Sequence, residues 1–248
     1  MQDKMNIGCV QIKIEEDVQK NIEKVNELTS DYSNYIFLLP ELFTTGFNYE
    51  HIEKQSENHF EVLQGLSEKN IYMGSILRFK DGKRYNSFFV KYKKEVYFVY
   101  DKVNLFPLMD EDKYFSPGNG YYTFDINGVT AGCAICFDLR YCEVFYHLRN
   151  GGAKIVFLPA EWPAKRVEHF RALSIARAIE NQLYFVCCNV IGNTWSDVFG
   201  GNSMIIDPWG KVLADAKNFV DKVIVSEVDL KLVEEVRNKL PMRRDYER

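Results

Sequence analysis

Three of the six cysteines in this 248-residue chain lie in one short stretch, AGCAICFDLRYCE, at residues 131–143. Cys133 and Cys136 have the Cys-x-x-Cys spacing that occurs in redox pairs, in zinc sites and beside reactive thiols. The residues VTAGCAIC (129–136) predict a strand, and side chains along a strand alternate between its two faces. Cys133 and Cys136 would then point to opposite faces, which disfavours a disulfide between them.

A zinc site would need further ligands, because structural zinc takes four. The chain has no second Cys-x-x-Cys and no paired metal-ligand spacing among its histidines, which are His51, His59, His147 and His169. We therefore expect no metal. The cysteines in other apolar, strand-like runs are interpreted as buried packing residues, namely Cys9, Cys187 and Cys188. Cys133 is likewise interpreted as strand packing and Cys142 as helix packing.

Cys136 ends the predicted strand and precedes a predicted helix at residues 140–150. Such a strand–turn–helix junction exposes a nucleophile above a sheet, close to backbone N–H groups that stabilise an oxyanion. A free thiol has a pKa of about 8.5, so a nucleophilic cysteine needs a base or a positive neighbour. His169 is the histidine near a predicted strand end, and we interpret it as a helix-surface or packing residue.

Two other strand ends offer partners for Cys136. Glu41 closes the apolar run YIFLLPE (35–41), and Lys102 closes the run VYFVYDK (96–102). A Glu–Lys–Cys site suits acyl transfer, because the carboxylate takes the thiol proton, the ammonium stabilises charge and the sulfur attacks. On spacing alone, Lys102 could equally be a solvated strand end and Glu41 a cap.

These residues need strands that bring their ends together. The middle of the chain alternates aromatic-rich runs with turn signals and predicts hairpins. Before and after it, apolar runs alternate with segments of helical spacing, which favours mixed sheets covered by helices. The chain shows no repeat or linker, so we expect one domain over residues 1–248. Strands are predicted at 6–14, 35–41, 71–79, 129–136, 154–162, 184–192, 202–208 and 222–230, and helices at 17–30, 140–150 and 166–181.

The composition of the chain argues against binding to nucleic acid or insertion into a membrane. The net charge is −4, and acidic and basic residues are interspersed, so no basic stripe favours nucleic acid. No apolar run approaches the roughly 18 residues of a membrane span. The first residues, MQDKMNIGCV, lack the basic and apolar regions of a signal peptide. We therefore expect a cytoplasmic protein.

Three separated segments resemble the nitrilase superfamily of carbon–nitrogen hydrolases: LLPELFTTGF (38–47), YDKVNLFPLMDE (100–111) and CFDLRYCE (136–143). Two later segments, at residues 160–192 and 201–214, resemble its ω-amidase branch. This sequence departs from the branch at Phe170, where Trp is common, and at Cys142, where Pro is common. The resemblance spans essentially the whole chain. It implies a four-layer αββα sandwich of two mixed sheets covered by helices, a homodimer, and neither metal nor organic cofactor.

The resemblance also implies roles for individual residues. Glu41 matches the general base, Lys102 the charge-stabilising lysine and Cys136 the nucleophile. Glu111 best matches a further glutamate in the loop after the lysine, although Asp110 and Asp112 flank it. The main-chain N–H of Phe137 would form the oxyanion hole together with Lys102.

The implied reaction hydrolyses the terminal amide of a small ω-amidodicarboxylate, such as 2-oxoglutaramate, to acid and ammonia through a thioester on Cys136. Arg166 is the candidate for binding the substrate carboxylate, with a surface arginine as the alternative interpretation. Trp162, Phe47 and Phe106 are candidates for the pocket wall, although aromatic residues in apolar runs more often belong to the core.

Other interpretations stay open. The same fold could act on an N-carbamoyl amine, another aliphatic amide or a nitrile, or could serve as a non-catalytic binding module. Asp138, Arg140 and Glu143 lie beside the nucleophile, and we expect them to form a structural ion network that holds the turn.

Overall fold

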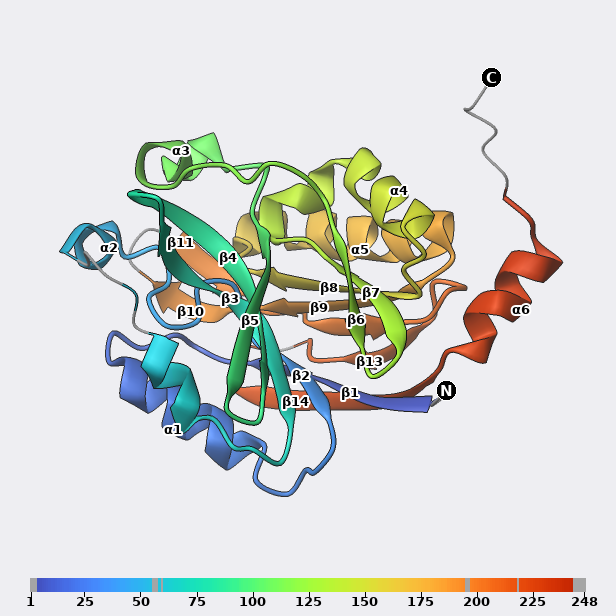
Figure 1. Cartoon of the computed structure of the whole chain (residues 1–248), viewed down its shortest axis with the longest axis horizontal. Coiled ribbons are helices and arrows are strands. Elements are labelled where there is room, and N and C mark those ends of the chain that lie inside the picture. Colours follow the sequence, from blue (N-terminus) through green and yellow to red (C-terminus); the bar gives the residue numbers. More distant parts are fainter. Residues whose placement is uncertain (1–3, 55–57, 59, 195–196, 218, 243–248) are drawn as a thin grey trace.

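The computed structural model describes residues 4–54, 58, 60–194, 197–217 and 219–242. Two six-stranded sheets pack face to face, and helices cover the outer face of each (Figure 1). The predicted αββα sandwich is therefore confirmed. A separate two-stranded hairpin consists of β10 (Ile191–Thr194) and β11 (Asp197–Gly200).

The first sheet has the strand order β14-β1-β2-β3-β4-β5. The short strand β2 pairs in parallel with both β1 and β3, and the remaining pairs are antiparallel. The strands are β1 (Lys4–Gln11), β2 (Ile36–Leu38), β3 (Ile71–Lys80), β4 (Lys83–Tyr92), β5 (Glu95–Asp101) and β14 (Lys222–Asp229).

The second sheet has the order β13-β12-β9-β8-β7-β6, with β7, β8 and β9 parallel to one another. All six residues of β8 are buried, as expected for a strand covered on both faces. The strands are β6 (Thr123–Ile126), β7 (Val129–Cys133), β8 (Ile155–Ala160), β9 (Tyr184–Asn189), β12 (Met204–Ile206) and β13 (Val212–Asp215).

Helix α1 (Val18–Leu28) covers the first sheet, while α4 (Cys142–Asn150) and α5 (Val167–Asn181) cover the second (Figure 1). The side chain of Asp17 caps α1 by accepting a hydrogen bond from the N–H of Gln19. The shorter elements are α2 (Tyr49–Lys54), η1 (Phe60–Gly65), η2 (Pro107–Met109), α3 (Glu111–Tyr114), η3 (Cys136–Arg140), η4 (Ala164–Arg166) and α6 (Lys231–Lys239).

Two sequence-based expectations about cysteines need correction. Strand β7 ends at Cys133, three residues earlier than predicted, and Cys136 begins the 3₁₀-helix η3. Cys142, expected to pack inside a helix, is exposed at the start of α4. The predictions for the other cysteines are confirmed, because the buried ones include Cys9, Cys133, Cys187 and Cys188.

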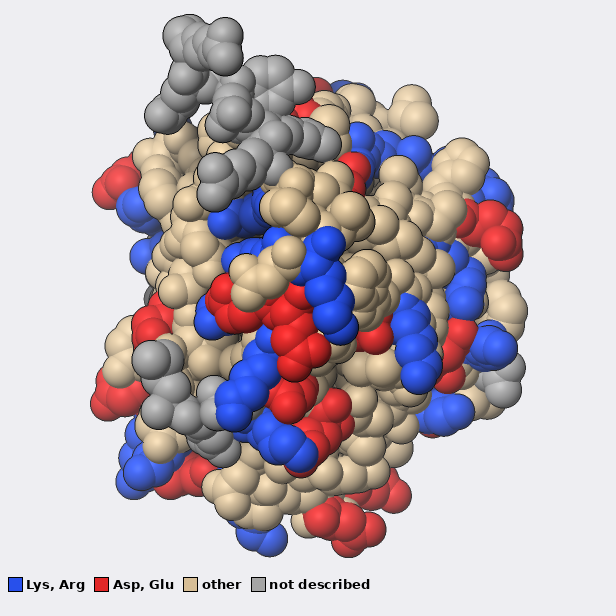
Figure 2. Space-filling model, turned by 90° about the vertical axis from the view of Figure 1, so that its right-hand side faces the viewer, with Lys and Arg blue, Asp and Glu red and all other residues tan. Residues whose placement is uncertain are grey.

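The surface agrees with the mixed charge of the sequence. On the face shown in Figure 2, acidic and basic side chains are interspersed. No helix in the described residues is long and apolar enough to cross a membrane.

Candidate active site

The four residues with predicted catalytic roles lie together at one end of the sandwich. Glu41 follows β2 and Lys102 follows β5 in the first sheet, Cys136 follows β7 in the second, and Glu111 begins α3. The two sheets meet at this point, because the main-chain N–H of Glu161, just past β8, donates to Oε2 of Glu41 at 2.9 Å. The structure thus brings together residues that are far apart in the sequence.

Lys102 lies at the centre of this group. Its Nζ donates to Oε1 of Glu41 at 2.8 Å and to both oxygens of Glu111 at 2.8 and 2.7 Å. All three side chains are fully buried. Burial by itself would lower the pKa of Lys102, but the carboxylates of Glu111 and Glu41 outweigh it and hold the pKa well above the usual value. The alternative of a solvated strand end is therefore wrong.

Glu111, rather than its acidic neighbours, reaches Lys102. Asp110 instead pairs with Lys113 at 2.9 Å in an exposed position. The other contact of Glu111 fixes its loop, because Oε2 accepts from the N–H of Phe106 at 2.7 Å. Burial raises the pKa of Glu111 to about 6, with Lys102 opposing the shift and Glu41 adding to it.

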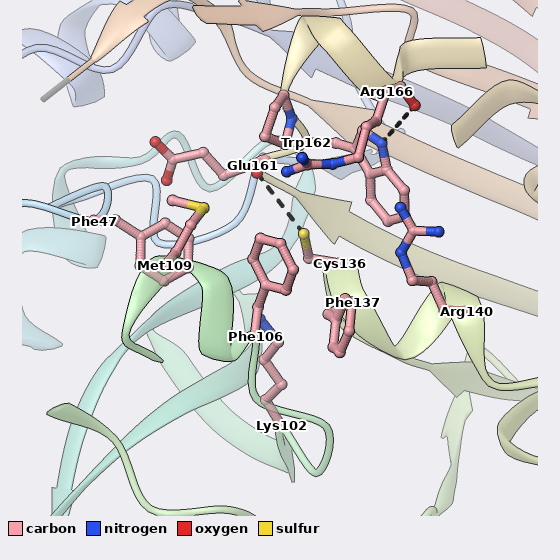
Figure 3. A pocket seen from close by; sticks show the side chains of 11 residues that line it. Phe47, Lys102, Phe106, Met109, Cys136, Phe137, Arg140, Glu161, Trp162 and Arg166 are labelled. Carbon is pink, nitrogen blue, oxygen red and sulfur yellow. Dashed lines mark hydrogen bonds between the residues drawn. The ribbon is translucent and has the colours of Figure 1, made fainter. Parts of the chain in front are cut away.

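Cys136 has an unusual backbone conformation, with φ at 45° in the left-handed region. Its Sγ lies 3.8 Å from the carbonyl oxygen of Glu161 (Figure 3). Burial raises the pKa of the Cys136 thiol well above its usual value, the charge of Glu41 raises it further, and Lys102 opposes both. The N–H of Phe137, at the start of η3, has no partner within the helix.

Asp138 holds the turn through uncharged partners. Its Oδ2 accepts from the N–H of Ile135 at 2.8 Å and from the hydroxyl of Tyr100 at 2.7 Å. Its Oδ1 accepts from the side-chain amide of Asn104 at 2.8 Å. These bonds tie the turn at Cys136 to the chain on both sides of Lys102.

The predicted ion network of Asp138, Arg140 and Glu143 is therefore wrong. Neutral donors already satisfy the buried carboxylate of Asp138, and Glu143 is exposed. Arg140 instead stacks its guanidinium over the ring of Trp162, 4.7 Å from the centroid. Arg140 thereby faces the cavity beside Cys136.

A small cavity opens at the thiol (Figure 3). All four residues predicted to bind substrate line it, together with Lys102 and Cys136. Sequence reasoning missed several lining residues, including Arg140, four residues after Cys136. The predicted lining residues are Phe47, Phe106, Trp162 and Arg166, and the others are Met109, Phe137, Arg140, Glu161 and Pro163.

Two guanidinium groups face this cavity. Arg140 ends η3 and Arg166 ends η4, and Arg166 lies 5.4 Å from the ring centroid of Phe106. Neither forms an ion pair with an acidic residue in the described parts of the chain. Burial and the charge of Arg166 lower the pKa of Arg140. The arrangement concentrates positive charge where an anionic group could bind.

Two buried asparagines were not singled out from the sequence. Asn189, on β9, accepts from the N–H of Trp162 at 2.7 Å and donates to its carbonyl oxygen at 3.1 Å, which fixes the cavity wall. Asn86, on β4, contacts the carboxylates of Glu41 and Glu111. Both asparagines lie within apolar runs that predict strands. The sequence signal for each of them is therefore a polar residue that interrupts such a run.

Other sequence-level candidates lie outside the site. His169 is exposed on α5, as interpreted, and His59 lies outside the described residues. In the portion of the chain that the structure describes, no cluster of His, Cys, Asp and Glu could hold a metal ion.

Comparison with known proteins supports this architecture. The carbon–nitrogen hydrolase family model matches residues 6–238. The chain is 34% identical to a 2-oxoglutaramate amidase of Bacillus subtilis over 250 residues, covering 96% of each protein. It is 29% identical to an ω-amidase of Xenopus laevis over 265 residues, covering 97% of this chain and 94% of that protein.

A solved structure shows the same fold. A CN-hydrolase superfamily protein of Xanthomonas campestris superimposes with a TM-score of 0.87 at 22% identity, covering 96% of this chain and 95% of that one. Together with the family match over residues 6–238, these similarities show that the chain belongs to the carbon–nitrogen hydrolase family and is a hydrolase of amide C–N bonds.

Proposed function

We propose that this hydrolase removes the terminal amide of a small dicarboxylic acid monoamide, such as 2-oxoglutaramate, and releases ammonia. The observation that carries the proposal is the presence of Arg140 and Arg166 in the same small cavity as the Cys136 thiol. A substrate with a carboxylate at one end and an amide at the other matches this pairing of cations and nucleophile. The similarity to a 2-oxoglutaramate amidase supports the same substrate class.

The first half of the proposed reaction forms a thioester. Glu41 takes the proton from Cys136, and the thiolate attacks the amide carbon. The N–H of Phe137 and the ammonium of Lys102 stabilise the oxyanion, with Lys102 giving up one of its two bonds to Glu111. The C–N bond then breaks, and ammonia leaves with the proton that Glu41 held.

The second half hydrolyses the thioester. Glu41 or Glu111 removes a proton from a water molecule, which attacks the thioester carbon. The C–S bond breaks, the thiol regains its proton, and the acid product leaves. Every proton in this scheme moves through side chains of the protein, so the reaction as proposed needs neither metal nor organic cofactor.

The alternative substrates lack an anionic group that could bind Arg140 and Arg166. An uncharged aliphatic amide or nitrile would leave both guanidinium groups without an anion, and an N-carbamoyl amine fits only if it carries a carboxylate. Ammonia release should be measured on 2-oxoglutaramate, succinamate and an uncharged amide of the same length, with product masses for each. We expect turnover of the carboxylated amides and none by Cys136→Ala. Absence of ammonia release from every ω-amide would refute the proposal.

Substitution of Arg140 and Arg166 tests their proposed role in binding the substrate carboxylate. Arg166→Met and Arg140→Met keep much of the side-chain volume but remove the charge. Each should lower kcat/KM for the carboxylated amide by roughly 30-fold, equivalent to about 2 kcal/mol, mainly through KM. Kinetics on the uncharged amide of the same length provide the control, because loss of a carboxylate contact should leave that substrate unaffected. Equal losses on both substrates would contradict this role.

We also propose that the enzyme works as a homodimer. Ile179 on α5 and Trp209 in the β12–β13 turn are each about half exposed. The turn that carries Trp209 packs against α5, since a Cβ added at Gly210 would meet the Ile179 side chain at 2.5 Å. This outer apolar patch on the α5 layer supports pairing with a second copy.

A further inference from the structure

Asn86 lies on β4, beside the strand that leads to Lys102. Its carbonyl oxygen accepts from the N–H of Lys102 at 2.9 Å, and the residue is 1% exposed. We propose that Asn86 is a positioning residue that orients the carboxylate of Glu41, so that one oxygen of Glu41 remains open to the Cys136 thiol. The proposal rests on the roles assigned above to Glu41 and Cys136.

The amide group of Asn86 serves two carboxylates at once. Its Nδ2 donates to Oε1 of Glu41 at 2.8 Å and to Oε1 of Glu111 at 3.3 Å. An amide nitrogen carries two hydrogens, one for each bond. A hydroxyl or a protonated carboxyl has one hydrogen, and an ionised carboxylate has none. Among side chains of this size, asparagine is therefore the type that can satisfy both.

The acceptor positions of Glu111 are all occupied. A carboxylate oxygen can accept two hydrogen bonds. Oε1 accepts from Asn86 and Lys102, and Oε2 accepts from Lys102 and from the N–H of Phe106. Glu111 is thus held as a fixed counter-ion for Lys102 and is unavailable to the thiol in the resting state.

Glu41 is held in a different way. Its Oε1 accepts from Asn86 and Lys102, whereas Oε2 accepts one bond, from the N–H of Glu161, among the residues that the structure describes. One acceptor position therefore remains, on Oε2. The thiol lies beside the same donor, because Sγ of Cys136 is 3.8 Å from the carbonyl oxygen of Glu161, whose N–H bonds this Oε2. The donors on Oε1 thereby direct the proton of Cys136 to the other oxygen.

The remaining atom of the amide supports a role beyond packing. Oδ1 of Asn86 is buried and has no hydrogen-bond partner within the described part of the chain. Such an atom lowers the stability of the folded state. A leucine would fill the same space without this cost, so the structure retains the amide for its two hydrogens.

The test uses a readout that needs no substrate. Iodoacetamide alkylates thiolates, so the pH dependence of Cys136 alkylation reports the ease of ionising this thiol. Trypsin cleaves after Arg140, so peptide mass spectrometry separates Cys136 from the exposed Cys142. The variants are Asn86→Asp and Asn86→Ser. Asn70→Asp is the matched control, because Asn70 is also buried and its side-chain amide bonds the main chain of Tyr32 and Tyr35.

Asn86→Asp places a further negative charge beside Glu41 and Glu111, which disfavours the thiolate. We expect the alkylation midpoint to rise by about one pH unit or more, and ammonia release to fall about 10- to 100-fold. Asn86→Ser keeps one hydrogen and should show a smaller loss. Asn70→Asp should retain the wild-type midpoint and turnover.

Folded Asn86 variants with the wild-type midpoint and wild-type turnover would overturn the proposal. If Asn86→Asp does not fold, judged by circular dichroism, Asn86→Ser provides the same test. A shifted midpoint in an enzyme whose wild type releases no ammonia from any ω-amide would support the positioning role and reject the proposed substrate instead.

Discussion

Lys102 lies between two buried carboxylates, so the group formed with Glu41 and Glu111 carries one net negative charge when all three are ionised. In a buried site such a charge is poorly screened. Burial raises the pKa of Cys136, and the charge of Glu41 raises it further against the opposing charge of Lys102. A raised thiol pKa suits the proposed mechanism, in which Cys136 gives its proton to Glu41 during attack.

Titration of Glu111 should make the activity of the enzyme depend on pH. Its pKa is raised to about 6, and protonation would weaken the ion pair with Lys102. We expect kcat/KM to fall as pH drops below about 6, because protonation of Glu111 removes its charge from Lys102. Glu111→Gln should lower activity at neutral pH and remove this acidic limb. A wild-type profile that stays flat down to pH ~5 would contradict the assignment.

Glu111 should also make the stability of the folded state depend on pH. The direction is opposite to that for activity, because stability falls as pH rises. A carboxyl whose pKa is higher in the folded state binds its proton more tightly when folded, so its stabilising contribution is complete below the unfolded value of 4.5 and is lost as pH rises to about 6. The loss is about 2 kcal/mol across that window. Denaturant unfolding of the wild type and Glu111→Gln at pH 4.5 and pH 6 measures it, with the difference between the two proteins isolating this residue.

At the scale of elements, the position of Lys102 depends on a close approach by another loop. The N–H of Gly118 donates to the carbonyl oxygen of Lys102 at 2.8 Å. A Cβ at Gly118 would lie 2.0 Å from the carbonyl oxygen of Asp101, which is backbone and cannot move aside. Glycine is therefore required where this loop packs against the end of β5.

Gly118→Ala should push the loop away from β5 and shift Lys102. A displacement near 1 Å at a reacting group costs about 100-fold in rate, so we expect a loss of this order in kcat. Gly128→Asn is the control, because Gly128 also lies in a turn but has no atom within 4 Å of an added Cβ. Its φ of 79° is close to the left-handed region that asparagine tolerates. Full activity in Gly118→Ala would show that Lys102 does not depend on this loop.

The sequence predicted the positions of the strands better than the residues at which they end. Apolar runs located β1, β3 and β8, and strand-end polarity pointed to Glu41 and Lys102. The run VTAGCAIC continues past the end of β7 because Ala134 to Cys136 are buried in the turn, so hydrophobicity could not mark where the ladder stops. Arg140 was misassigned for a related reason, because the direction of a side chain in a 3₁₀ turn does not follow from spacing.

At the scale of the whole molecule, periodicity favoured mixed sheets with helices but could not decide how the sheets pack. Face-to-face packing depends on contacts such as those between β1 and β9, which are far apart in the sequence. The family resemblance supplied this part of the fold, and it supplied the role of Glu111 as well. The roles assigned to the catalytic residues stay predictions until the variants are measured.

The proposed dimer can be tested on the α5 layer. Trp209→Glu together with Ile179→Glu should convert a dimer into a monomer in size-exclusion chromatography with light scattering, because two charges would be buried in the interface. Tyr97→Glu is the control, since Tyr97 is similarly exposed on β5 of the other sheet. A wild-type monomer at all concentrations would reject the dimer.

The bond between the N–H of Glu161 and Oε2 of Glu41 joins the ends of two separate sheets. Each sheet keeps its own ladder of hydrogen bonds, but neither contains a complete active site. A slight separation of the sheets would therefore abolish turnover while the strands remain intact. During gradual denaturation, catalysis should disappear before the far-ultraviolet signal of secondary structure changes, which makes activity a sensitive gauge of how tightly the two halves of the sandwich stay closed.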